Sequence, residues 1–232
     1  MNKKGFLDEI FVSYQGEGVL AGVRQVFIRF SLCNLKCTYC DTAAAGESKA
    51  SFTAFWKKSI KNPVNAEEVL KLLKSFRGRI HSVSLTGGEP LVQGDFAVEL
   101  AKGLKSAGFR VYLETNGTLV VPLKKILPYT DLVAMDIKLP SSSGQKGLWE
   151  KHTKFLKTAA KKVFVKIVVS GKTRLPELRQ AVKMAKKSIV VLQPEYKSDI
   201  KKVLNLIEKS GVFSTGVDIR IIPQIHRFIG IK

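Results

Sequence analysis

Regular alternation between short apolar runs and amphipathic segments limits the fold of this chain more than any other feature of its sequence. From residue 65 onward, apolar runs typical of strands occur at 80–86, 110–115, 132–137, 163–169, 189–192 and 217–222. Between them lie segments with helical spacing, at 65–76, 95–107, 123–127, 146–160, 176–187 and 199–209. Strands that alternate with helices form right-handed βαβ units around a parallel sheet. We therefore expect an α/β fold, either an open doubly wound sheet or an incomplete barrel.

The N-terminal part of the chain has a different pattern. Two apolar runs, at 10–14 and 25–31, predict strands, and the glycine-rich segment QGEGVLAG separates them. Residues 42–63 match no template, and Asn65 is the expected N-cap of the helix that follows. With 232 residues and no repeat or linker, the chain is expected to form one domain over 1–232. Its expected parts are strands within 8–31, a cysteine loop at 32–42, the βα core at 65–222 and a C-terminal tail at 223–232.

Composition and charge narrow the class of protein. No apolar run reaches the roughly 18 residues that a membrane span needs, and Asp8 and Glu9 interrupt any signal-peptide core. We therefore expect an unexported, cytoplasmic protein without a membrane partner. The 39 Lys and Arg residues outnumber the 19 Asp and Glu residues, which gives a formal charge of +20. Such an excess can mark a nucleic-acid partner, but the cations of residues 146–187 are not interleaved with aromatic side chains that stack on bases. We favour solvated lysine-rich helix faces and expect no direct nucleic-acid partner.

The three cysteines of the chain, Cys33, Cys37 and Cys40, follow directly on a predicted strand. An odd number so close together is not a disulfide framework. A structural zinc site needs four ligands, and none of the three histidines lies at zinc-finger spacing. Three thiolates can instead hold a [4Fe–4S] cluster and leave one iron open to bind a further ligand. We predict such a cluster, with inert buried thiols as the alternative.

Two motifs together resemble the signature of the radical S-adenosylmethionine (SAM) superfamily: Cys33-x3-Cys37-x2-Cys40, with Tyr39 before the last cysteine, and Leu85-Thr-Gly-Gly-Glu-Pro-Leu91 at the end of the next predicted strand. The resemblance implies an incomplete (β/α) barrel of parallel strands. It also implies that the open iron binds SAM, which one electron cleaves to a 5′-deoxyadenosyl radical. By the same resemblance SAM is contacted by Tyr39, Gly87, Gly88, Glu89, Asp136, Lys138 and Gln193. A tight turn for the glycine motif and a surface position for Lys138 are the structural alternatives.

Three further segments are similar to motifs of the 7-carboxy-7-deazaguanine synthase family: Ser13-Tyr-Gln-Gly-Glu-Gly18, Cys40-Asp-Thr42 and Pro223-Gln-Ile-His226-Arg-Phe-Ile-Gly230. The resemblance implies a carbon–nitrogen lyase that acts on 6-carboxy-5,6,7,8-tetrahydropterin. In that reaction a hydrogen leaves C6, the ring contracts and ammonia is lost, which gives the deazapurine of queuosine-type tRNA modification. The resemblance also implies a second metal, Mg²⁺, beside the substrate carboxylate.

Polar residues of these segments, together with Arg29, Glu114 and Asn116, suit a planar pterin that carries one carboxylate. We expect substrate contacts from Gln15, Glu17, Arg29, Glu114, Asn116, Gln224 and His226. Carboxylates accept hydrogen bonds from ring N–H groups, amides donate and accept, and the guanidinium of Arg29 can take a carboxylate bidentately. Glu17 and His226 are the expected catalytic residues, and Thr42 is the expected oxygen ligand of Mg²⁺.

Each of these assignments has a structural alternative. Arg29 can serve only an ion pair, and residues 114–117 can cap a turn at the end of a strand. Thr42 can be a helix N-cap, and His226 can be a histidine without a role in the reaction.

The resemblance also implies partners. An electron donor such as flavodoxin or ferredoxin would reduce the cluster, and a homodimer is compatible with the sequence. Two other functions remain open: a radical SAM activase that forms a glycyl radical on a partner enzyme, and an iron–sulfur protein that binds nucleic acid. The activase leaves the QGEG segment and the Gln224-x-His226 pair without a small molecule to bind.

Overall fold

The computed structural model describes residues 3–40, 48–55 and 58–231, and its main feature is a ten-stranded sheet with the order β12-β11-β10-β9-β8-β7-β3-β2-β4-β5. Seven neighbouring strands in this order are parallel: β3 (Arg24–Phe30), β7 (Ser82–Gly87), β8 (Val111–Thr115), β9 (Leu132–Asp136), β10 (Val163–Val169), β11 (Val190–Pro194) and β12 (Ile219–Ile221). They lie side by side in the order of the chain, so each helix crosses the same face and the sheet is not doubly wound. The expected incomplete barrel is confirmed.

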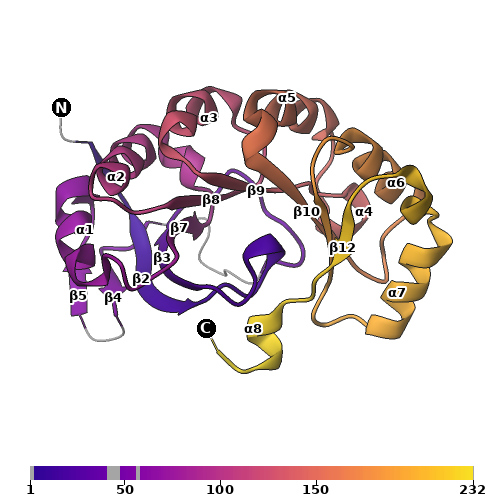
Figure 1. Ribbon diagram of the computed structural model, residues 1–232, viewed down its shortest axis with the longest axis horizontal. Coiled ribbons are helices and arrows are strands. Elements are labelled where there is room, and N and C mark those ends of the chain that lie inside the picture. The colour runs from indigo at the N-terminus through magenta and orange to yellow at the C-terminus, as the bar shows by residue number, and fades with distance from the viewer. Residues whose placement is uncertain (1–2, 41–47, 56–57, 232) are drawn as a thin grey trace.

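Helices cover the convex side of the curved sheet, and the concave side faces the N-terminal loop and the C-terminal tail (Figure 1). The covering helices are α1 (Ala66–Leu73), α2 (Gly94–Ser106), α3 (Val120–Ile126), α5 (Trp149–Ala159), α6 (Leu175–Met184) and α7 (Ile200–Lys209). The first of them begins as predicted, because the Asn65 side chain accepts from Glu68 N and the Glu68 side chain accepts from Asn65 N.

Short elements complete the chain. Single turns of 3₁₀ helix lie at η1 (Gly18–Leu20), η2 (Lys74–Phe76), η3 (Pro90–Gln93), η4 (Leu127–Tyr129), η5 (Ala160–Lys162) and η6 (Val212–Thr215). Two four-residue helices are α4 (Pro140–Ser143) and α8 (Ile225–Phe228). The strand β2 (Leu7–Tyr14) pairs antiparallel with β3, and a small separate sheet joins β1 (Lys4–Gly5) to β6 (Val64–Asn65).

The segment that matched no template contains a hairpin. Strands β4 (Ser51–Ala54) and β5 (Lys58–Lys61) pair antiparallel and extend the sheet beyond β2. Each has four residues and few apolar ones, which is too short for a clear alternating pattern. Thr42, the expected ligand of Mg²⁺, lies outside the described residues. None of the helices in the described ranges is long and apolar enough to cross a membrane.

Inside the curve of the sheet, side chains of neighbouring strands form two layers. The lower layer is apolar and contains Tyr112, Ala134, Phe164 and Val191, against which Val19 and Leu20 of η1 pack. Alternate residues of a strand point to the same face, so the residues two positions later on each strand also point inward: Glu114, Asp136, Lys166 and Gln193. A layer of apolar side chains therefore lies next to a layer of polar side chains, and the polar layer is nearer the carboxyl ends of the strands.

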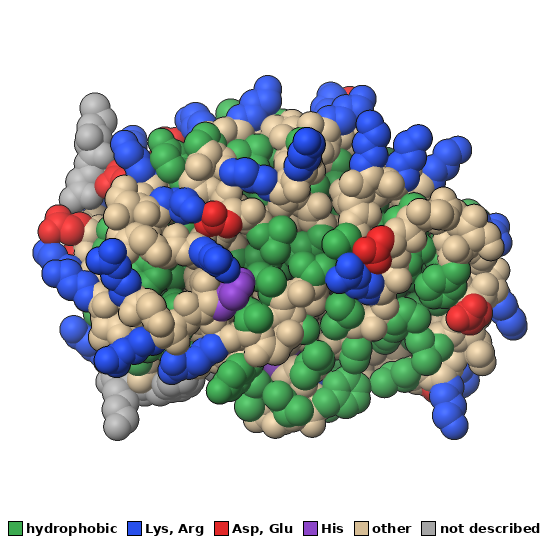
Figure 2. Space-filling view, viewed as in Figure 1, with side chains coloured by type: hydrophobic (Ala, Val, Ile, Leu, Met, Phe, Trp, Pro, Cys, Tyr) green, Lys and Arg blue, Asp and Glu red, His purple; other side chains and the backbone are tan. Residues whose placement is uncertain are grey.

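The cations lie mostly on the outside of the molecule. Lys151, Lys154 and Lys157 of α5 are exposed, as are Lys161 and Lys162 of η5. Figure 2 shows Lys and Arg side chains scattered over this face and along its outline rather than gathered in one stripe. Solvated lysine-rich helix faces stay our prediction for this charge.

A close approach of backbone at the end of β7 leads to the first prediction. Gly88 N donates to Phe30 O (2.9 Å) and Glu89 N donates to Leu32 O (2.8 Å). A Cβ at Gly88 would overlap the Leu32 carbonyl oxygen and lie 3.3 Å from Cys33 Cβ. Overpacking costs about 1–3 kcal/mol, so we expect Gly88→Ala to lower the midpoint of thermal unfolding by about 2–12 °C, measured by circular dichroism. Gly171→Ala is the control, because its Cβ would meet no atom within 4 Å; equal midpoints for the two variants would contradict the prediction.

Candidate active site

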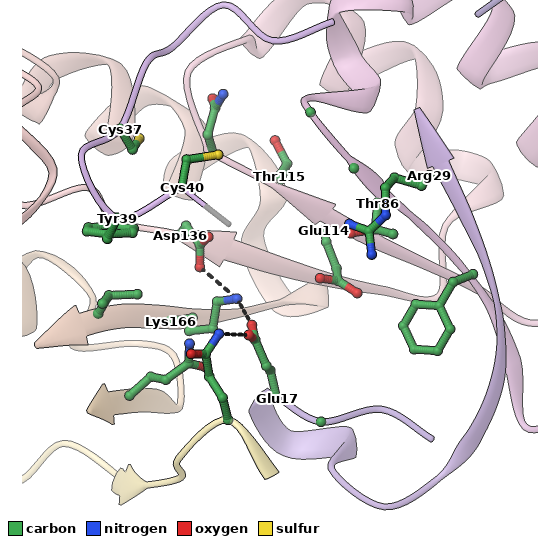
Figure 3. Close-up of a pocket in the computed structure, with 18 of the residues that line it drawn as sticks. Glu17, Arg29, Cys37, Tyr39, Cys40, Thr86, Glu114, Thr115, Asp136 and Lys166 are labelled. Carbon is green, nitrogen blue, oxygen red and sulfur yellow. Dashed lines mark hydrogen bonds and ion pairs between the residues drawn. The ribbon is translucent and has the colours of Figure 1, made fainter. Parts of the chain in front are cut away.

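One pocket lies inside the curve of the sheet at the carboxyl ends of the parallel strands, the usual place for an active site in such folds (Figure 3). It brings together most residues singled out in the sequence: Gln15, Glu17, Arg29, Cys33, Cys37, Tyr39, Cys40, Gly87, Gly88, Glu114, Asn116, Asp136, Lys138, Gln193, Gln224 and His226. The exceptions are Thr42, which is not described, and Glu89, which does not line the pocket.

The three cysteines occupy a loop that leaves β3 through Leu32, whose backbone is in the left-handed region (φ 70°). All three cysteines line the pocket. The loop is fastened to α4, because Thr38 N donates to Ser143 O (3.0 Å) and the Thr38 hydroxyl donates to Ser142 O (2.7 Å). Burial raises the pKa of the Cys33 and Cys37 thiols.

Three thiols on one short loop fit the donor set of a [4Fe–4S] cluster, whose ligands are Cys thiolates. Within the described ranges, no three His, Cys, Asp or Glu side chains form a group that could hold a single metal ion.

Next to the cysteine loop the pocket wall carries a cation and two buried acceptor oxygens. Lys138 Nζ pairs with Asp136 Oδ2 (2.8 Å) and lies 5.3 Å from the centre of the Tyr39 ring. Burial raises the pKa of the Tyr39 hydroxyl to about 12, so it stays neutral. Two buried oxygens, Asp136 Oδ1 and Gln193 Oε1, accept no hydrogen bond within the described residues, although Asp136 Oδ1 forms an ion pair with Lys166 Nζ at 3.3 Å. Because buried acceptors normally have donors, these oxygens fit a ligand that brings hydroxyl or amino groups.

The opposite wall is organised by Gln15. Its Oε1 accepts from Glu17 N (3.0 Å), and its Nε2 donates to Gln25 Oε1 (3.0 Å) and to Glu114 Oε1 (3.1 Å). Ser84 Oγ also donates to Glu114 Oε1 (2.7 Å). Burial raises the pKa of Glu114, although Lys166 opposes this. In this structure Gln15 uses its amide to place the two glutamates.

Glu17 is bound from the C-terminal tail and from the sheet. Gln224 Nε2 donates to Glu17 Oε1 (2.7 Å), and Lys166 pairs with Glu17 Oε2. Burial alone would raise the Glu17 pKa, but Lys166 and Gln224 hold it below its usual value. The tail is held in place because Ile225 N donates to Gly16 O (2.9 Å). The His226 ring occupies the space that a Cβ at Gly16 would need.

Arg29 stands at the other end of this wall. Register pairs it with Glu9 across β2 and β3, and its Nε donates to Glu9 Oε1 (2.8 Å). The guanidinium carbon lies 5.6 Å from the centre of the Phe11 ring, which stacks on Phe27 with 5.0 Å between centroids. The ion pair that we considered as an alternative for Arg29 is therefore present, and the guanidinium still lines the pocket (Figure 3).

Glu89, an expected SAM contact, is buried behind the residues that line the pocket. Its carboxylate is fully buried and accepts from Asn116 N (2.6 Å), Leu91 N (3.1 Å) and Thr115 Oγ1 (2.9 Å). Burial raises the Glu89 pKa to about 7, in spite of these donors. In this structure Glu89 ties the end of β7 to the end of β8. Asn116 continues this link, because its Nδ2 donates to Asn34 Oδ1 (2.8 Å) in the cysteine loop.

The sequence analysis missed Lys166, which lies in the middle of the polar layer. It is buried, pairs with Glu17 and lies 3.3 Å from Asp136 Oδ1. A signal for it exists in the sequence, since Lys166 is the single charge in the apolar strand Val163–Val169. Buried lysines are rare unless they are paired, so a lysine within an apolar strand marks a functional candidate.

Comparison with known proteins agrees with this site. The model of the radical SAM superfamily matches residues 27–207. A 7-carboxy-7-deazaguanine synthase of Geobacter sulfurreducens is 38% identical over 99% of both chains, and one of Archaeoglobus fulgidus is 39% identical over 97% of this chain and 98% of its own. The resemblance inferred from the motifs is confirmed.

Solved structures share the fold. The crystal structure of QueE from Escherichia coli has a TM-score of 0.70 at 24% identity and covers 96% of this chain and 95% of its own. Streptococcus suis SuiB bound to S-adenosylmethionine has a TM-score of 0.61 at 16% identity over 94% of this chain and 51% of its own. The cysteine loop, the singly wound sheet and the full-length relatives lead to one conclusion: this chain belongs to the radical SAM superfamily and, within it, to the 7-carboxy-7-deazaguanine synthase family.

Proposed function

We propose that this radical SAM enzyme converts 6-carboxy-5,6,7,8-tetrahydropterin to 7-carboxy-7-deazaguanine with loss of ammonia. The observation that carries the proposal is that one pocket holds the three thiols on one side and Arg29, Glu17 and Glu114 on the other. The names of the full-length relatives support the same reaction.

The substrate side of the pocket offers groups that complement the two ends of a carboxypterin. Glu17 and Glu114 supply acceptors for ring N–H and amino groups, and the guanidinium of Arg29 supplies two parallel donors for the carboxylate. Phe11 and Phe27 add apolar surface beside Arg29. The lowered pKa keeps Glu17 ionised, so Glu17 acts as an acceptor. The neighbouring imidazole of His226 is the group suited to exchange a proton during ammonia loss.

The cofactor side suits SAM. Cys33, Cys37 and Cys40 would hold the [4Fe–4S] cluster, and the bound cofactor would supply the radical that removes hydrogen from C6. Lys138 offers a cation for the carboxylate of SAM. Asp136 Oδ1 and Gln193 Oε1 offer acceptors for its hydroxyl and amino groups. The electron comes from outside the chain, and a flavodoxin or ferredoxin is the donor that we propose.

The reaction itself is tested by anaerobic incubation of the iron-reconstituted protein with SAM, dithionite and the carboxytetrahydropterin, followed by mass spectrometry. We expect 7-carboxy-7-deazaguanine from the wild type. Arg29→Ala and Glu17→Gln should each lower kcat/KM by about 10- to 100-fold, because each loses a charge-assisted hydrogen bond to the substrate. Glu150→Gln is the control, since Glu150 forms an exposed pair with Lys154 on α5. A wild type that forms a glycyl radical on a partner enzyme and no deazapurine would contradict the proposal.

The cluster is tested separately by metal analysis. We expect about four irons per chain after anaerobic reconstitution and an electron paramagnetic resonance signal that changes when SAM is added, because three cysteines leave one iron open. Cys33→Ala, Cys37→Ala and Cys40→Ala should each abolish both results. Stoichiometric zinc together with failed iron reconstitution would show that this is not a radical SAM site.

The proposal includes Mg²⁺ near Thr42, because a hard cation with an oxygen ligand can hold the substrate carboxylate opposite Arg29. We expect turnover to rise with Mg²⁺ and to fall in EDTA without loss of iron. Thr42→Ala should weaken the response to Mg²⁺, and Thr42→Ser should retain it because the hydroxyl survives. Normal turnover of Thr42→Ala in metal-free buffer would refute the Mg²⁺ assignment and leave the radical reaction untouched.

A further inference from the structure

Lys166 is a charged residue of the pocket that neither the motifs nor the proposed chemistry uses, as is Glu195, and of the two Lys166 is the more deeply buried. It lies on β10, in which all seven residues are buried, and only 8% of its surface is exposed. Removing an ammonium group from water is costly, and the cost is offset only by close carboxylates. A lysine at this position therefore stays charged only beside its carboxylate partners, and the buried carboxylates in turn are stabilised by its positive charge.

The partners of Lys166 come from two different parts of the chain. Glu17 lies in the QGEG segment just before η1, and Asp136 ends the neighbouring strand β9. Register places Lys166 beside Asp136 on adjacent parallel strands, with 3.3 Å between Lys166 Nζ and Asp136 Oδ1. Figure 3 shows the ammonium group between these two carboxylates.

The two carboxylates serve opposite halves of the pocket. Asp136 also pairs with Lys138, which lies over the Tyr39 ring beside the cysteine loop. Glu17 also accepts from Gln224 of the C-terminal tail. The result is a continuous row of alternating charges, Lys138, Asp136, Lys166 and Glu17, that runs from the cysteine loop to the tail. Without Lys166, two carboxylates would face each other across the polar layer, with Glu114 on the next strand.

We propose that Lys166 is a positioning residue for both halves of the site: its ammonium group holds the Asp136 carboxylate in place for SAM and the Glu17 carboxylate in place for the pterin. The substrate half of this inference rests on the proposed reaction, and the cofactor half rests only on the SAM contact proposed for Asp136. Lys166 acts through the two carboxylates. Its loss therefore weakens the binding of both SAM and the pterin, even though the thiols and Arg29 remain.

The test compares ligand affinities of anaerobically reconstituted variants by isothermal titration calorimetry. The probes are SAM and 6-carboxypterin, and only protein with the iron content of the wild type is used. We expect Lys166→Met to lower the affinity for each of the two probes at least tenfold. Lys166→Arg keeps the positive charge and should bind each ligand at least threefold more tightly than Lys166→Met. Lys154→Met removes an exposed lysine that pairs with Glu150 and should change neither affinity.

Several results with the Lys166 variants would count against the inference. Unchanged affinities in Lys166→Met, loss of one ligand alone, or no recovery in Lys166→Arg would overturn the joint role of the ammonium group. If Lys166→Met does not fold, the Glu17→Gln/Lys166→Met variant, which removes one charge of each sign, replaces it, and an unchanged affinity for SAM then overturns the inference. A wild type that binds SAM but no 6-carboxypterin refutes the proposed function instead, and Lys166 is then judged by SAM affinity alone.

Discussion

Parallel pairing in the order of the chain is the constraint on which the rest of this structure depends. Because β3, β7, β8, β9, β10, β11 and β12 lie side by side in sequence order, every strand delivers its carboxyl end to the same rim. The loops that leave this rim include the cysteine loop after β3 and the turns after β7 and β8. Residues that are more than 100 positions apart in the sequence therefore line one pocket.

The concave face adds a second level of order. The apolar layer of Tyr112, Phe164 and their neighbours fills the lower interior, and η1 packs Val19 and Leu20 against it. That packing fixes the position of the QGEG segment along the strands, so that Glu17 lies beside the polar layer, nearer the carboxyl ends of the strands. The charges there are arranged in pairs of opposite sign, which allows several ionised groups to share one partly buried space. The apolar packing and the charged layer of the pocket thus both come from the alternate residues of each strand that point to the concave face.

Most of the fold follows from features that are local in the sequence. The alternation of strands and helices predicted the parallel core, and Asn65 marked the start of α1. The hairpin β4–β5 could not be predicted, because its first strand pairs with β2, more than 35 residues earlier in the chain, and its second strand pairs only with the first. Its stability comes from tertiary pairing, which leaves no periodic pattern in the segment itself.

The candidate site follows the same rule. The sequence motifs located the cysteine loop and the QGEG segment. A motif does not show the direction in which each side chain points. The motif alone, for example, does not show that the Glu89 carboxylate is buried and accepts from three donors. Lys166 was missed because its partners, Glu17 and Asp136, are 149 and 30 residues away in the sequence and become neighbours only when the sheet forms.

The central claim is that cofactor and substrate occupy opposite walls of one pocket, and an anaerobic crystal structure of the reconstituted protein with SAM and 6-carboxypterin tests it most directly. We predict SAM on the open iron, within contact of Lys138 and Gln193. We predict the pterin between them and the tail, with its ring edge on Glu17 and its carboxylate on Arg29. A pterin bound outside this pocket, or with its carboxylate turned away from Arg29, would contradict the account.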